Sequence, residues 1–318
     1  MAQQVIVVSG GLSHEREVSI ESGRRVCKEL TRAGFDVSES DVQASLIDLI
    51  RSLDHPVVVP MLHGGSGEDG AVREVFELMG VHYVGTRAPA CRASFDKALA
   101  VPVVAKAGLT VPKRVVLPHE MFRDLGANVL LDLIEDKLGL PLFVKPTMSG
   151  SALGASRVDR IEDLPAAMVN AYSYGRTVVV EEFIAGVEVA VPVFDFGEGP
   201  LAFPPVEIRP ASGSYDFEAR YTAGATTYIC PAELDDATLK AVQDAAVTAH
   251  RCLSLRDFSR ADIIVRDGVP VFIESSVAPG MTDTSLVPLS LATAGQDFGD
   301  ALAAVVRQSA IRQVESSL

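Results

Sequence analysis

The sequence predicts three packed lobes of α/β and α+β type, with a parallel β-sheet in the N-terminal lobe. Two apolar runs, at 4–11 and 55–70, end in glycine loops and are followed by helical patterns. Continuous Val/Ile strands that alternate with helices are typical of parallel sheets covered on both faces. Beyond about residue 96 the pattern becomes strand-rich and punctuated by glycine, which favours antiparallel sheet. We predict an N-terminal domain over 1–95, a central lobe over 96–183 and a C-terminal lobe over 184–318.

Amphipathic patterns place helices in all three lobes. The first helix follows the loop at 10–15 and is expected to end near Gly34. Further helices are expected at 71–80, 96–108, 121–138, 235–253 and 299–313. Two strand-like runs between 258 and 276 flank Asp267-Gly268, a dipeptide that is a strong hairpin signal.

Charge and hydropathy exclude several classes of partner. The chain has 318 residues, of which 48% are hydrophobic, and a formal net charge of -14. No Lys/Arg run is dense enough to bind a phosphate backbone, so a nucleic-acid partner is not expected. No apolar stretch approaches the roughly 18 residues of a membrane span, and the N-terminus has no basic leader. We expect a cytoplasmic protein without a membrane partner.

The four cysteines stand far apart and form no C-x-x-C pair or zinc-like cluster with histidine. We interpret Cys27, Cys91, Cys230 and Cys252 as buried free thiols of a reducing compartment.

The hairpin carries a candidate metal site. A strict two-residue loop would place Asp262 opposite Ile273, whereas a three-residue loop or one bulge would place it opposite Glu274. The two-residue period of a strand then adds Ser276 to the same face. Two carboxylates and a hydroxyl form the kind of oxygen cluster that Mg²⁺ prefers beside nucleotide phosphates. The alternative is that Asp262 and Glu274 are solvated edge residues.

The segment FVKPTMSGSALG at 143–154 is a candidate phosphate loop. Lys145 ends a predicted strand, and Ser149, Gly150, Ser151 and Gly154 follow it. Glycines allow close backbone approach, and successive N–H groups suit phosphate oxygens. The spacing is not that of a P-loop, and a mobile surface hairpin is the alternative.

Other polar residues lie where a ligand or a structural role would explain them. Glu181 and Glu188 interrupt strands that otherwise look buried, so they need a partner such as ribose or adenine unless they lie at an exposed edge. Glu15 precedes a helix, a position that favours carboxylates without any ligand. His63 follows a strand and fits a loop histidine bound to backbone. No Ser/His/Asp arrangement appears, and the first glycine loop, SGGLSHE at 9–15, does not have the G-x-G-x-x-G spacing of a dinucleotide site.

Taken in order, nine segments resemble the ATP-grasp superfamily and, within it, the D-alanine:D-alanine ligases. The segments are GGLSHEREVS at 10–19, LHGGSGEDG at 62–70, FDK at 95–97, VKPTMSGSALG at 144–154, VEEFIAGVEV at 180–189, YDFEARYTAG at 215–224, CPA at 230–232, SRAD at 259–262 and ESSVAPGMTDTSL at 274–286. Each is weak alone, but the ordered set spans nearly the whole chain and is specific.

The resemblance implies an ATP-dependent carboxylate–amine ligase that forms D-alanyl-D-alanine through an acyl phosphate for peptidoglycan synthesis. It also implies a homodimer formed through the N-terminal lobe, and two Mg²⁺ ions, with Mn²⁺ as an alternative. The implied roles are as follows: Lys97, Lys145 and Ser151 bind ATP phosphates; Glu181 lies near adenine and Glu188 on ribose; Asp262, Glu274 and Ser276 bind metal; Glu15, His63 and Ser285 bind D-alanine; Arg260 and the N–H of Gly280 face the oxyanion; and Tyr221 connects Glu15 with Ser151.

Four positions depart from the family pattern. Ser276 stands where the family has Asn, and a hydroxyl is a shorter metal ligand than an amide carbonyl. Ala152 replaces a serine, Arg220 a lysine and Ser259 a frequent cysteine. These departures leave two alternatives open: a ligase that joins other small amino acids, or an ATP-binding homologue without turnover. The chemistry also predicts mobile lids at 149–154 and 213–224 that exclude water.

Overall fold

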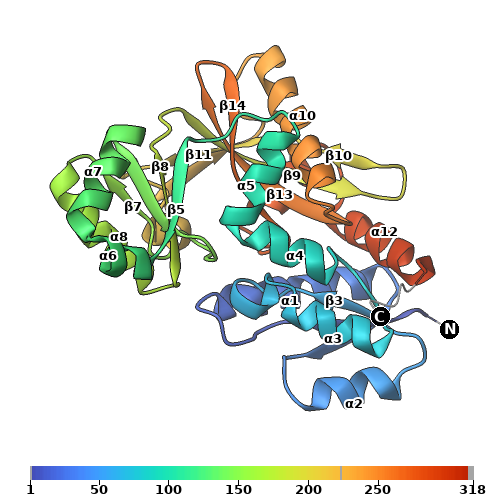
Figure 1. The fold of residues 1–318 in the computed structure, drawn as a ribbon. Helices are drawn as coiled ribbons and strands as arrows, with labels where there is room; N and C mark the ends of the chain where they lie inside the picture. Colours follow the sequence, from blue (N-terminus) through green and yellow to red (C-terminus); the bar gives the residue numbers. More distant parts are fainter. Residues whose placement is uncertain (1, 223, 314–318) are drawn as a thin grey trace.

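The computed structural model describes residues 2–222 and 224–313 and has three β-sheets, one in each predicted lobe. In Figure 1 the N-terminal lobe is blue, the central lobe green, and the C-terminal lobe yellow to red. The N-terminal sheet has the order β2-β1-β3-β4, and every pairing in it is parallel. The prediction of a mixed α/β and α+β fold with an N-terminal parallel sheet is confirmed.

The elements of the N-terminal lobe alternate between strand and helix, as the sequence pattern predicts. They are β1 (Gln4–Val8), α1 (Arg16–Arg32), β2 (Asp36–Ser40), α2 (Ser45–Ser52), β3 (Val57–Pro60), a 3₁₀ turn (Gly65–Gly67), α3 (Ala71–Met79) and β4 (His82–Tyr83). Strands β1 and β3 are almost wholly buried because helices cover the sheet on both faces. The loops after β1 and β3 therefore meet at the carboxyl edge of the sheet, where ligands of such sheets lie.

The central lobe is an antiparallel sheet with helices on one side. Its elements are β5 (Arg114–Pro118), α6 (His119–Leu125), α7 (Ala127–Leu138), β6 (Leu142–Pro146), β7 (Ser156–Val158), a 3₁₀ turn (Ile161–Asp163), α8 (Leu164–Tyr172) and β8 (Thr177–Glu182), in the sheet order β5-β8-β6-β7. The prediction of one helix over 121–138 is wrong. Gly126 takes φ 91° there and separates α6 from α7.

The C-terminal lobe is built on a larger antiparallel sheet of order β12-β11-β9-β13-β14, with β10 paired to β9. Its elements are β9 (Val187–Asp195), β10 (Pro200–Ala202), β11 (Val206–Pro210), α9 (Phe217–Tyr221), β12 (Thr226–Ile229), α10 (Asp236–Cys252), β13 (Phe258–Arg266), β14 (Val269–Ser276), α11 (Leu286–Thr293) and α12 (Phe298–Ile311). Helix α12 packs on α1, so the apolar core of the N-terminal lobe continues into this lobe.

Two further helices, α4 (Ala88–Phe95) and α5 (Lys97–Lys106), connect the lobes. Both pack against β14, and α5 also contacts α10. In Figure 1 they lie between the N-terminal sheet and the C-terminal lobe. The apolar side of α5 therefore belongs to the core of the C-terminal lobe, although its sequence position is in the segment that we assign to the central lobe.

The hairpin of β13 and β14 has both a two-residue turn and a bulge. Arg266 pairs with Val269 across Asp267-Gly268, yet Asp262 pairs with Glu274 and Ile263 with Phe272. Ile273 is the extra residue that shifts the register. The alternative in which Asp262 faces Glu274 is confirmed.

All four cysteines are unpaired, but only Cys91 is fully buried. The expectation of buried thiols is wrong for Cys27, Cys230 and Cys252, which lie at partly exposed positions. Even so, burial raises the pKa of the Cys27 thiol to about 12. Within the described residues, no helix is both long and apolar enough to cross a membrane.

Candidate active site

Two adjoining cavities lie where the three lobes meet. Cavity A, of about 700 Å³, lies between the N-terminal loops, the loop that follows β14, and β13. Cavity B, of about 560 Å³, lies between the central sheet and the β13–β14 hairpin. Lys97, Ser149, Tyr215, Arg220 and Glu274 line both cavities, so a group bound in one can meet a group bound in the other.

The structure brings nearly all of the predicted site residues to these two cavities. Cavity A is lined by Glu15, His63, Lys97, Ser151, Arg260, Glu274, Ser276, Gly280 and Ser285. Cavity B is lined by Lys97, Lys145, Glu181, Glu188, Asp262 and Glu274. Tyr221 ends α9, and its side chain lies outside the described part of the chain.

Cavity B contains two ion pairs formed by lysines. Lys145 Nζ lies 2.5 Å from Glu181 Oε1, and the side chains are only 7% and 6% exposed. Lys97 Nζ lies 3.0 Å from Glu274 Oε2 and donates to the carbonyl of Ser149 at 2.9 Å. The open-edge alternative for Glu181 does not fit this geometry, since a buried carboxylate needs the partner that Lys145 supplies. Two ammonium groups in one cavity can bind phosphate oxygens.

Asp262 and Glu274 lie on neighbouring strands at directly opposed positions. Arg260 binds Asp262 through two hydrogen bonds of 2.7 Å. Burial alone would raise the pKa of Glu274, but the charges of Lys97 and Lys145 outweigh it and lower the pKa to about 2. Both carboxylates keep unused lone pairs, so this pair fits a hard divalent cation such as Mg²⁺. No group of three or more His, Cys, Asp or Glu side chains gathers as a metal site in the described residues.

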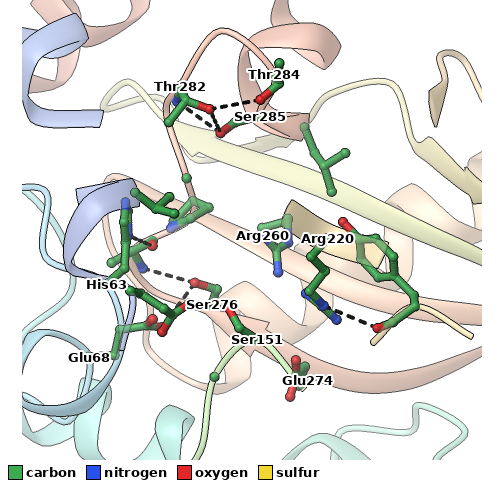
Figure 2. A pocket seen from close by; sticks show the side chains of 18 of the residues that line it. His63, Glu68, Ser151, Arg220, Arg260, Glu274, Ser276, Thr282, Thr284 and Ser285 are labelled. Carbon is green, nitrogen blue, oxygen red and sulfur yellow. Dashed lines mark hydrogen bonds between the residues drawn. The ribbon is translucent and has the colours of Figure 1, made fainter. Parts of the chain in front are cut away.

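Ser276 lies beside this pair but lines cavity A only. Its hydroxyl donates to Glu68 Oε2 at 3.1 Å and accepts from the N–H of Ala278 at 3.3 Å. Figure 2 shows Ser276 between Glu68 and Ser151. A hydroxyl has one donor and two acceptor positions, so one lone pair is left for a metal. Ser276 as a metal ligand stays a prediction.

Glu15 and Ser151 join the N-terminal and central lobes across cavity A. The Ser151 hydroxyl donates to Glu15 Oε1, and Glu15 occupies the N-cap position of α1. Gly64 and Gly150 both pack against this carboxylate, and a Cβ at either would collide with it. Ser151 takes a φ of 48°, which is uncommon for a residue with a side chain. The loop at 149–154 therefore lies against the N-terminal lobe.

Arg260 and Ser285 both line cavity A. The side chain of Arg260 is 16% exposed, and Figure 2 shows it pointing into the same space as Arg220. Ser285 precedes α11 and exchanges hydrogen bonds with Thr282. Cavity A thus has an anionic end at Glu15 and a cationic side at Arg260. This arrangement suits a ligand with both an ammonium and a carboxylate.

Comparisons with known proteins agree with this geometry. The family model for the D-ala D-ala ligase C-terminus matches residues 103–307. A D-alanine--D-alanine ligase of Desulforudis audaxviator is 37% identical over 96% of this chain and 98% of its own length. The corresponding ligase of Fervidobacterium nodosum is 33% identical, with coverages of 95% and 98%.

The chain belongs to the D-alanine–D-alanine ligase family. Solved structures with the same fold include the VanG D-Ala:D-Ser ligase of Enterococcus faecalis, with TM-score 0.84 and 28% identity over 97% of this chain and all of that one. The D-alanine--D-alanine ligase of Bacillus anthracis complexed with ATP has TM-score 0.81 and 27% identity, with 97% of both chains covered. The predicted ATP-grasp fold and ligase class are confirmed.

Several residues of this family member's site are absent from the sequence prediction. Glu68 is buried in the wall of cavity A and accepts from the N–H of Gly64 at 2.9 Å. Tyr215 and Tyr228 line the same cavity, 3.0 Å apart at their hydroxyls. Ser22 is wholly buried behind His63. Glu68 lies in the glycine-rich loop GGSGEDG after a strand, a position that could have marked it as a site residue. Ser22 lies in an ordinary helical pattern that contains no such sign.

Glu188 gives this family member a pH-dependent stability. Burial raises the pKa of its carboxyl to about 7. An unfolded carboxyl titrates lower, so ionised Glu188 destabilises the folded state increasingly as pH rises from about 4.5 through 7. We expect Glu188→Gln to stabilise the nucleotide-free protein by at most about 3 kcal/mol near pH 8 and to change its stability little near pH 4, below both pKa values. Urea unfolding at both pH values measures this. The exposed Glu198→Gln is the control, and an equal effect at both pH values would contradict the assignment.

Proposed function

We propose that this protein uses ATP to join two molecules of D-alanine into D-alanyl-D-alanine, a precursor for peptidoglycan. One observation carries the proposal: a cavity with two buried lysines and a carboxylate pair adjoins a cavity with an anionic and a cationic end. Phosphoryl transfer requires the first kind of site. The cavity with an anionic and a cationic end suits a pair of zwitterionic amino acids. The residues that line both cavities place the phosphate of ATP next to the amino acids.

Cavity B is the proposed ATP site. Lys97 and Lys145 bind phosphate oxygens, while Glu181 lies near adenine and Glu188 near ribose. Asp262, Glu274 and Ser276 would hold two Mg²⁺ ions. When bound, the metal neutralises phosphate charge during transfer. The two lysines share that role and orient the γ-phosphate toward cavity A, while Ser151 and its loop cover it.

Cavity A is the proposed amino-acid site. Glu15 receives the ammonium of the first D-alanine, whose carboxylate becomes the acyl phosphate. Ser285 receives the carboxylate of the second D-alanine, and His63 lies in the wall between them. Arg260 and the Gly280 N–H face the oxyanion that forms when the amine attacks. Tyr221 connects Glu15 with Ser151, and the lids at 149–154 and 213–224 exclude water from the acyl phosphate.

A related activity remains a second candidate. The VanG structure is named a D-Ala:D-Ser ligase and covers the chain as fully as the D-alanine ligase structure does. The two activities share the first amino acid, so they differ only at the end of cavity A near Ser285. A substrate comparison separates them.

The deciding experiment measures phosphate release from ATP and Mg²⁺ with D-alanine alone, D-alanine plus D-serine, and L-alanine, with products identified by mass. We expect D-alanyl-D-alanine and release that depends on D-alanine. Release only with D-serine would assign the second activity. A folded protein that binds ATP without releasing phosphate would be a binding homologue, and recovery of release in Ser276→Asn would trace the loss to that position.

We also propose a homodimer through the N-terminal lobe. Val75 and Leu78 on α3 are 40% and 65% exposed, which supports a contact on this lobe. Light scattering during size-exclusion chromatography measures the mass, and a monomer at all concentrations would exclude the dimer.

A further inference from the structure

The loop that follows β14, residues 277–285, is held by the N-terminal lobe on both sides of Gly280. Before Gly280, the carbonyl of Ala278 lies 2.7 Å from His63 Nδ1. After it, the N–H of Met281 donates to Ser22 Oγ at 3.0 Å. The same Ser22 Oγ lies 2.9 Å from His63 Nε2. Ser22 and His63 therefore close a ring of hydrogen bonds around Pro279 and Gly280.

The direction of every hydrogen bond in this ring follows from its chemistry. A carbonyl only accepts, so His63 Nδ1 carries a proton and donates to Ala278. Ser22 Oγ accepts from Met281, which leaves its own proton for Nε2 of a neutral imidazole. Burial lowers the pKa of His63; Glu15 raises it and Arg260 lowers it to smaller extents, so the neutral form agrees with the geometry. The ring thus fixes one tautomer of His63.

Gly280 is the residue that this ring positions. In the described residues its N–H has no hydrogen-bond partner, and it lines cavity A. A Cβ at this position would lie 2.8 Å from Ser285 Oγ, so Gly280 lies directly against the proposed site of the second amino acid. An N–H without a partner at this place is available to a developing oxyanion.

We propose that Ser22, acting with His63, is a positioning residue that sets the Gly280 N–H for oxyanion stabilisation. The proposal rests on the proposed ligase function. Ser22 does not line either cavity, so it acts only through the loop. Oxyanion donors work within a narrow range of distance, and small displacements cost much of the rate. A ring that grips both neighbours of Gly280 restricts such displacements.

Helix α1 supplies a matched control. Ser19 lies one turn before Ser22 and is equally buried, but its hydroxyl donates to the Met61 carbonyl at 2.6 Å and accepts from the Gly10 N–H at 2.8 Å. It therefore joins segments within the N-terminal lobe. Ser22→Ala and Ser19→Ala should lower the melting temperature to a similar extent, because each removes one buried hydroxyl with two hydrogen bonds.

We expect Ser22→Ala to lower kcat about tenfold or more with KM for ATP and D-alanine unchanged, and Ser19→Ala to leave kcat unchanged. His63→Asn keeps a donor near the Ala278 carbonyl but cannot reach Ser22, so it should lower kcat likewise. Its combination with Ser22→Ala should cost little more than either alone, because both break one ring. Equal kcat in Ser22→Ala and Ser19→Ala would overturn the proposal. It would also be overturned if the losses of kcat in Ser22→Ala and His63→Asn were fully additive in the double variant.

A second measurement does not depend on turnover. Hydrogen–deuterium exchange of the segment 278–282 should become faster in Ser22→Ala and His63→Asn and stay unchanged in Ser19→Ala. If the wild-type protein releases no phosphate with any amino acid, the proposed function fails while this measurement still tests the ring. Unchanged exchange in Ser22→Ala would overturn the ring itself.

Discussion

Arg260→Ala is expected to lower kcat by about 10²–10³-fold while ATP affinity stays near the wild-type value. The Arg260 side chain is only partly exposed, lines cavity A, and is held by two hydrogen bonds to Asp262. Its interactions with Asp262 offset the cost of burial and raise its pKa, so it stays charged at every pH of interest. A fixed positive charge here stabilises the negative charge that develops on the oxygen of the tetrahedral intermediate. Steady-state kinetics and nucleotide titration measure the two quantities.

Two further variants separate this role from general damage. Arg260→Lys keeps the charge but not the planar fork, so it should recover part of the rate. Arg266→Ala removes an arginine at the other end of β13, where it contacts Glu182 at 3.5 Å, and should leave kcat unchanged. Wild-type kcat in Arg260→Ala would show that Arg260 does not face the oxyanion. Loss of ATP binding in the same variant would show instead that freeing Asp262 disturbs cavity B.

The fold was largely predictable because the apolar periods of strands and helices depend on local sequence. The break at Gly126 was not predicted, because an isolated glycine inside a helical pattern can be tolerated without ending the helix. The packing of α5 into the core of the C-terminal lobe could not be predicted from the sequence either. Its apolar side is compatible with either neighbouring sheet, and only the packing against β14 decides between them.

The residues of the site were predictable where a short motif contains them, as with Lys145 or Asp262. Contacts between distant segments were not. The pairing of Asp262 with Glu274 depends on one bulge at Ile273, which the sequence left open. The hydrogen bond from Ser276 to Glu68 joins positions 208 residues apart. The ring around Gly280 uses a serine in a helix whose pattern gives no sign of function.

Lys145→Met is expected to destabilise the folded protein by about 3–5 kcal/mol and to weaken ATP binding at least about tenfold. Removing the lysine leaves the Glu181 carboxylate buried among β6, β8 and cavity B without its cation. The cost comes mainly from that uncompensated charge rather than from the lost attraction. Urea unfolding and ATP titration measure the two effects separately.

The double variant Lys145→Met/Glu181→Gln distinguishes the two roles of this ion pair. With both charges absent, stability should return close to the wild-type value, because a buried pair and a neutral pair of similar volume often differ little. ATP binding should remain weak, since no ammonium is left beside the phosphates at this position. If the double variant bound ATP normally, Lys145 would serve only to neutralise Glu181, and Lys97 would be the lysine that binds the phosphates. If stability stayed low, the loss would come from packing at β6 rather than from charge.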